Sequence, residues 1–71
     1  MLKYLVVIEK TKSGFSAYVP DLPGCIATGK TKKIVERNIY AAVKFHIEGL
    51  REEGLPIPKQ ATESEVFVFA A

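Results

Sequence analysis

Four side chains in this sequence have the chemistry of catalytic groups: His46, Cys25, Glu9 and Asp21. His46 falls within the apolar stripe of a predicted helix, which favours a buried structural histidine over a proton-transfer or pH-sensing group. Cys25 follows a tight turn, where a small side chain packs well, so we expect core filler rather than a reactive thiol. Glu9 and Asp21 are too far apart in sequence to indicate the carboxylate pair of a metal nuclease. We therefore predict a protein that is not an enzyme.

Composition limits the remaining classes of protein. A single cysteine and a single histidine exclude an intrachain disulfide and an ordinary zinc site, so we expect no metal, no cofactor and a reducing, cytoplasmic compartment. The length of 71 residues, the hydrophobic content of 48% and the net charge of +2 predict one soluble domain over residues 1–71 with a small core. The apolar run at residues 4–8 is too short to cross a bilayer, and no membrane contact is expected.

Lysines gather at two places that could bind an anion. Lys30, Lys32 and Lys33 stand at the predicted start of a helix, where they oppose the helix dipole, and Lys10 and Lys12 lie in the first predicted turn. One interpretation is a contact with phosphate or RNA. The other is a solvated basic rim, because no set of exposed aromatic side chains accompanies the lysines for base stacking.

A strand and a proline-rich turn organise the sequence that positions these groups. Over residues 15–19 the apolar side chains alternate with Ser16 and Tyr18, which is typical of a strand with an inner and an outer face. Pro20, Asp21, Pro23 and Gly24 then form a structural turn, since proline cannot donate to a ladder and glycine tolerates a positive φ. The next strand should begin at residue 25.

A helix follows the third strand. Apolar positions recur at steps of three and four residues from Thr31 onward, which predicts an amphipathic helix with Thr31 as its N-cap. Gly54 at a C-cap position, followed by Pro56, places the end of the helix near Glu53. The core-facing stripe comprises Val35, Ile39, Ala42, Val43, His46 and Leu50.

These elements predict an α+β fold. Strands are expected at residues 2–9, 15–19, 25–29 and 64–70, with the helix between the third and the fourth. The first three form an antiparallel meander, and the helical crossover allows the last strand to lie parallel to the first. The result is a βββαβ two-layer arrangement with strand order three-two-one-four.

This fold exposes more apolar surface than one helix can cover. The first and last strands are apolar on both faces, and Ile34, Ala41 and Phe45 form a second stripe on the helix, opposite the core-facing one. We interpret both surfaces as interfaces. The alternative is that Phe45 is a scattered exposed aromatic and that residues 55–60 cover the second face of the sheet.

The sequence resembles the HicB-like antitoxin family over nearly its whole length. The resemblance rests on residues 14–25, on Gly29, Lys30 and Thr31, on Asn38 and Ala42, and on residues 54–58. It implies a partial RNase H-like fold without nuclease carboxylates, self-association as a dimer or tetramer, and binding to a small HicA-like toxin that cleaves mRNA.

Two hypotheses remain open. In the first, the chain is an antitoxin-like interaction module whose partner-binding residues are Ile34, Ala41, Phe45, Asn38 and Asp21. In the second, it is a small RNA- or anion-binding protein that uses the lysines. Many family members append a DNA-binding module that residues 1–71 have no room for, so DNA binding through this chain alone is not expected.

Overall fold

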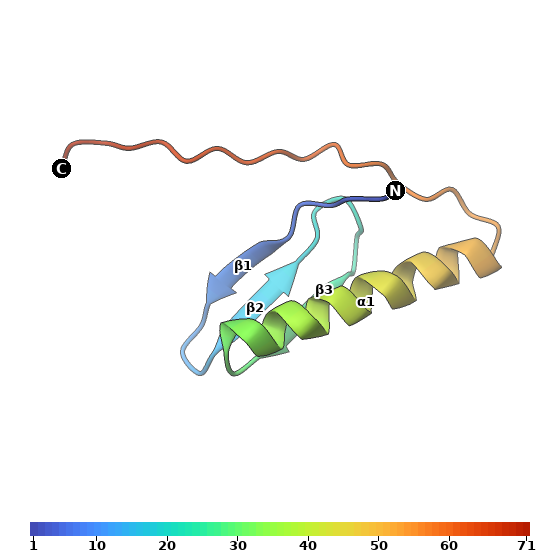
Figure 1. The fold of residues 1–71 in the computed structure, drawn as a ribbon, viewed down its shortest axis with the longest axis horizontal. Helices are drawn as coiled ribbons and strands as arrows, with labels where there is room; N and C mark the ends of the chain where they lie inside the picture. Colours follow the sequence, from blue (N-terminus) through green and yellow to red (C-terminus); the bar gives the residue numbers. More distant parts are fainter.

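The computed structural model describes residues 1–71 as a three-stranded antiparallel sheet with one helix across one of its faces (Figure 1). The strands are β1 (Val7–Lys10), β2 (Phe15–Tyr18) and β3 (Ile26–Gly29), in the spatial order β1-β2-β3, and the helix is α1 (Lys32–Glu52). The predicted α+β class and the antiparallel meander followed by a helix are confirmed. None of the chain's helical structure is long and apolar enough to cross a bilayer.

The register of the sheet separates an inner from an outer face. Ile8, Ala17 and Ala27 pair across the strands on the inner face, and Val7, Tyr18 and Ile26 pair on the outer face. Successive side chains of a strand point to opposite faces, so the inner row meets α1 and the outer row does not. The alternation predicted for residues 15–19 is thereby confirmed.

The proline turn folds over the end of the sheet. The Leu22 amide donates to the Val19 carbonyl at 3.1 Å, and the Cys25 amide donates to the Leu22 carbonyl at 3.0 Å. Gly24 has a φ of 82°, which a residue with a Cβ adopts only with strain. The turn delivers the Leu22 side chain into the core with 0% of its surface exposed. The strand that follows begins at Ile26, one residue later than expected.

Both ends of α1 have the predicted caps. The Thr31 hydroxyl accepts a hydrogen bond from the Ile34 amide at 3.1 Å, as an N-cap does. At the other end the Leu55 amide donates to the Leu50 carbonyl and the Gly54 amide donates to the Arg51 carbonyl. With Gly54 at a φ of 68°, this is a Schellman motif. The helix therefore ends at Glu52, with Glu53 as its C-cap.

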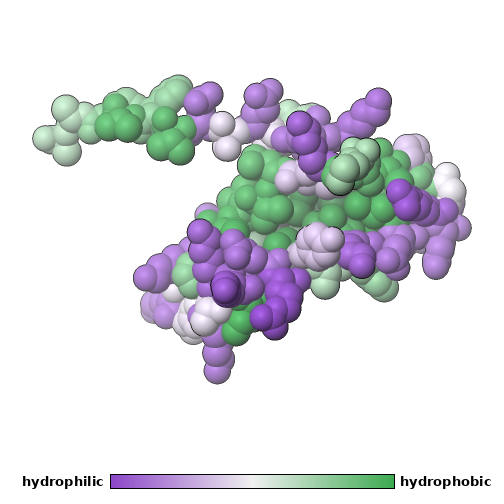
Figure 2. All heavy atoms as spheres, viewed as in Figure 1, coloured by the Kyte–Doolittle hydropathy of each residue, from purple (hydrophilic) through white to green (hydrophobic).

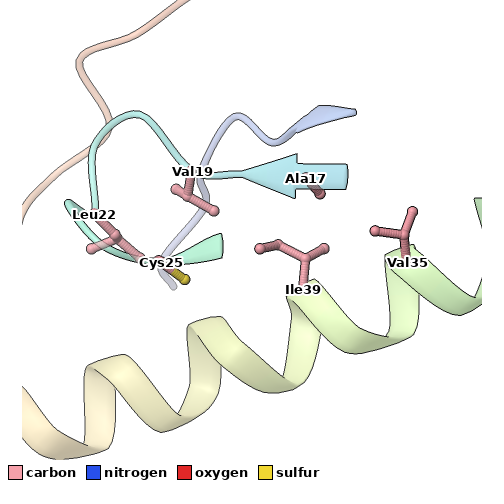
Figure 3. Close-up of a cluster of buried hydrophobic side chains, with 6 residues drawn as sticks. All are labelled: Ala17, Val19, Leu22, Cys25, Val35 and Ile39. Carbon is pink, nitrogen blue, oxygen red and sulfur yellow. The ribbon is translucent and has the colours of Figure 1, made fainter. Parts of the chain in front are cut away.

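A small core lies between the helix and two of the three strands. Its six buried residues are Ala17, Val19, Leu22, Cys25, Val35 and Ile39 (Figure 3). The helix packs on β3 and β2 and not on β1. The inner face of the chain around β1, which includes Tyr4, Val6 and Ile8, is consequently only half-buried.

Two predicted strands differ in the structure. The first is confined to Val7–Lys10: the Val19 amide donates toward the β3 side, to the Cys25 carbonyl, so the next residue after Tyr18 that faces β1 is Pro20, which has no N–H to continue the pairing. The fourth strand, expected at residues 64–70, is not shown: within one copy these residues form no strand and extend away from the body (Figure 1). The expected order three-two-one-four therefore lacks its last member, and the RNase H-like description, which needs that strand, stays a prediction.

Close packing of the helix start on β3 gives a first testable prediction. A Cβ added at Gly29 would lie 2.6 Å from the Val35 backbone nitrogen, whereas a Cβ at Gly49 on α1 would meet nothing within 4 Å. We expect Gly29→Ala to lower the free energy of unfolding by about 1–3 kcal/mol, the usual cost of overpacking. Gly49→Ala should raise it by about 0.4–1 kcal/mol, because alanine favours helix and restricts the unfolded chain.

Urea unfolding followed by circular dichroism checks this pair at matched chain concentration. The two midpoints should move in opposite directions relative to the parent. If Gly29→Ala unfolds at the same urea concentration as Gly49→Ala, the close contact between β3 and the helix start does not exist.

Candidate protein-interaction surfaces

The four candidate catalytic groups do not come together. Cys25 is buried in the core, and burial raises the pKa of its thiol, so the expected packing role is confirmed. His46 is half-buried on α1 rather than fully buried, because the C-terminal half of the helix extends beyond the strands (Figure 1). Glu9 is exposed on β1, and Asp21 bonds to the C-terminal segment. No group of three or more His, Cys, Asp or Glu side chains is placed to hold a metal ion.

Asp21 holds the segment that follows the helix. One carboxylate oxygen accepts the backbone amides of Ala61 at 3.0 Å and Thr62 at 3.2 Å, and the other accepts the Thr62 hydroxyl at 2.8 Å. These bonds, that of the Ala61 amide first, hold the pKa of Asp21 below its ordinary value of 3.8. In addition, the Tyr4 hydroxyl donates to the Pro58 carbonyl. We call the contacts made by Asp21 and Tyr4 the tail clamp.

The tail clamp predicts an acid-sensitive C-terminal segment. The pKa of Asp21 is lowered in the folded state, so the bonds stabilise the fold above the unfolded value of about 3.9 and are lost as pH falls through the folded value. We expect the amide signals of Ala61 and Thr62 to move toward unfolded positions below about pH 4 in NMR spectra. In an Asp21→Ala variant they should lie at unfolded positions already at neutral pH. Signals in the parent that stay constant through the acid range would contradict the clamp.

The outer helix stripe comprises Ile34, Ala41 and Phe45, all of them exposed, with 79% of Phe45 accessible. Asn38 lies within this stripe, and its side-chain amide donates to the Thr28 carbonyl of β3 at 2.8 Å. The stripe therefore runs beside the free edge of β3. Of the five expected partner-binding residues, Asn38 and Asp21 make bonds within the chain, and the roles of all five toward a partner stay predictions.

A second apolar surface lies on the opposite side of the helix. Here α1 and the chain around β1 enclose an open groove of about 560 Å³. Its apolar lining includes Leu2, Tyr4, Val6, Ile8, Tyr40 and Ile47. Sequence analysis did not single out Tyr40, which is 69% exposed, although Tyr40, Val43 and Ile47 repeat at helical spacing. Figure 2 shows hydrophobic side chains along the middle of the molecule and on the extended tail.

The outer face of the sheet is also open. Tyr18 and Ile26 are exposed there, Ile26 to 70%, so residues 55–60 do not cover this face. The expectation of an apolar surplus is confirmed for the sheet and for the helix. The tail adds to it, because Val66, Phe67, Val68 and Phe69 are between 71% and 94% exposed.

The two groups of lysines lie at one end of the molecule. The turn after β1 and the turn after β3 meet there, because a Cβ at Gly14 would collide with the Gly29 carbonyl oxygen. A shallow pocket between the turns is lined by Thr11, Ser13, Gly14, Phe15, Thr28, Gly29 and Lys30. All five lysines of the hypothesis are exposed: Lys10, Lys12, Lys30, Lys32 and Lys33. We call this the basic end.

Comparisons with known proteins agree with this fold. A family model described as the HicB_like antitoxin of bacterial toxin-antitoxin system matches residues 4–68. A UPF0150 protein of Thermoplasma acidophilum is 41% identical over 70 residues, which cover 97% of this chain and 100% of that protein. An uncharacterised 14.9 kDa protein of Haemophilus phage HP1 is 41% identical over 56 residues, 79% of this chain and 42% of that protein.

Two solved structures of toxin-antitoxin proteins have a similar fold. A chain of the HicA3 and HicB3 toxin-antitoxin complex aligns with a TM-score of 0.70 and 38% identity over 84% of this chain and 70% of that chain. The crystal structure of the antitoxin HicB3 aligns with the same score and identity over 84% of this chain and 44% of its own. The chain thus spans less than half the length of the phage protein and of that HicB3 chain.

Proposed function

We propose that this chain, which belongs to the family of HicB-like antitoxins of bacterial toxin-antitoxin systems, acts by binding and covering a small toxin of the HicA type. The matched solved structure is a complex of that kind, formed by HicA3 and HicB3, and this supports a partner of the same class here. The chain catalyses nothing in this proposal. It silences an mRNA-cleaving enzyme by burying its surface, and it does so in the cytoplasm, where mRNA is.

The observation that carries the proposal is the exposed outer helix stripe. Ile34, Ala41 and Phe45 lie on one rigid helix whose N-terminus is capped by Thr31, so the surface is fixed before a partner arrives. An aromatic side chain on such an apolar surface is the usual centre of a protein interface. We assign this stripe to the toxin, with Asn38 holding it beside the free edge of β3.

Self-association is the second part of the proposal. A chain of 71 residues that buries only six of them gains little stability alone, and copies that cover each other's apolar surfaces gain more. The groove beside β1 and the outer row with Tyr18 and Ile26 are free for this purpose. We propose a dimer or a tetramer of antitoxin chains, each with its outer helix stripe available to a toxin.

Co-expression with the product of the neighbouring reading frame tests the proposal. If that frame encodes a small basic toxin, the two proteins should co-purify at equal stoichiometry per chain, and the antitoxin should stop the toxin from cleaving RNA in vitro. The complex should survive an increase in salt, because an apolar interface depends little on ionic strength. A toxin that cleaves RNA equally well with and without an excess of this chain would refute the proposal.

RNA or anion binding at the basic end is the alternative function. The meeting of the two lysine-bearing turns favours it, because it places five exposed lysines at one end. Binding to phosphates would weaken steeply with salt, by about one power of the salt concentration for each contact. A Lys30→Glu/Lys32→Glu variant should then lose RNA binding and keep toxin inhibition, which separates the two functions.

A further inference from the structure

The C-terminal tail has the properties of a strand without a partner. Residues 63–70 are extended, exposed and apolar at four consecutive positions, and the rings of Phe67 and Phe69 lie on one side with their centroids 6.4 Å apart. An exposed apolar segment of this kind is a site for pairing with a sheet edge. The family match extends through residue 68, so most of the tail belongs to the unit that the family shares.

The same chain contains an acceptor for such a strand. β1 is an edge of the sheet, and its outer backbone groups have no neighbouring strand. Next to this edge lies the groove of about 560 Å³ between β1 and α1, where the helix leaves the inner face uncovered. Three charged residues line the groove, Lys3, Lys44 and Glu36, so its net charge is positive. Glu63 and Glu65 precede the aromatic pair of the tail and give it the opposite charge.

The tail clamp directs the tail away from its own acceptor. Asp21 fixes Ala61 and Thr62, and Tyr4 fixes Pro58, just before the segment 63–70 begins. From there the chain leaves the body in an extended conformation and ends far from β1 (Figure 1). The structure thus presents a fixed strand and a vacant edge that do not meet within one copy.

We propose that two copies exchange their tails, so that residues 63–70 of each copy add a fourth strand beside β1 of the other. Phe67 and Phe69 enter the groove next to Tyr40, while Val66 and Val68 face outward, as the alternation of a strand requires. The exchange is reciprocal and closes as a symmetric dimer. The inference rests on the self-association in the proposed function and names its surfaces.

Variants of the full chain test the exchange by sedimentation equilibrium. Phe67→Asp/Phe69→Asp places charges in the groove and should raise the dimer dissociation constant by about 100-fold or more. Tyr40→Asp, at the acceptor, should have an effect in the same direction. Val66→Asp/Val68→Asp is the matched control, with the same charges on the outward face, and should change the constant by less than about fivefold. Circular dichroism verifies that each variant keeps its helix.

Complementation decides whether the tail crosses between copies. Mixed in equal amounts, the Tyr40→Asp and Phe67→Asp/Phe69→Asp variants should form a dimer, because one parent tail meets one parent groove. A mixture that stays monomeric would overturn the exchange of tails. Variants that remain dimeric on their own would also overturn it, but they would leave the proposed self-association in place. If the parent chain is monomeric at every concentration, both the exchange of tails and the proposed self-association are refuted. Inhibition of the toxin is measured separately and tests the remainder of the proposed function.

Discussion

Replacing Leu22 by alanine is expected to unfold a large fraction of the chain at room temperature. The Leu22 side chain is completely enclosed, and Leu22 and Val35 are the two residues with 0% of their surface exposed. Shortening a buried leucine to alanine costs about 2–5 kcal/mol, because transfer energy is lost and a cavity remains. A single small core supplies only about 3–5 kcal/mol of net stability, so the two quantities are comparable.

The measurement is urea unfolding at a fixed chain concentration, since self-association adds to the apparent stability. Leu55→Ala is the matched control: it removes the same atoms from a side chain that is 47% exposed, and it should lower the unfolding free energy by less than about 1 kcal/mol. Equal midpoints for Leu22→Ala and Leu55→Ala would show that the proline turn does not anchor the core.

Leu22 also marks what the sequence could not predict. The prolines and Gly24 identify the turn through local backbone chemistry, and so do Thr31 and Gly54 at the ends of the helix. The burial of a side chain in the middle of a turn depends instead on where the turn folds back in space. No local sequence pattern distinguishes a leucine that is buried in the core from one that is exposed to water.

The C-terminal tail shows that local sequence also cannot predict whether a segment pairs as a strand. Its composition favours extended backbone, because valine and phenylalanine alternate, and the tail is extended in Figure 1 without forming a strand. A strand also needs a hydrogen-bonding neighbour, which is a property of the surroundings rather than of the segment. The bonds from Asp21 to Ala61 and Thr62 join residues about forty positions apart and leave no periodic signal in the sequence.

The interaction surfaces were predictable to different degrees. Helical spacing alone places Ile34, Ala41 and Phe45 on a face away from the core, and the structure agrees. The groove beside β1 was not foreseen, because it results from the position of α1 over β3 and β2 rather than over the centre of the sheet. That displacement leaves both sides of the helix exposed, one for the proposed tail strand and the other for the proposed toxin.

Replacing Phe45 by lysine is expected to weaken the toxin complex by about 30-fold or more, the loss typical of an aromatic residue at the centre of an interface. Because the side chain is 79% exposed, its removal should leave the free energy of unfolding within about 0.5 kcal/mol of the parent. The measurement is the affinity for the purified toxin by isothermal titration calorimetry, together with the inhibition of RNA cleavage.

Tyr40→Lys provides the comparison, because it makes the same kind of change on the other side of the helix. If the two sides have separate partners, Phe45→Lys should weaken toxin binding and leave the antitoxin dimer intact, while Tyr40→Lys should weaken the dimer and leave toxin binding within about threefold. The opposite pattern would exchange the two assignments, and equal losses of toxin affinity in both variants would show that the toxin wraps around the whole helix rather than docking on the outer helix stripe.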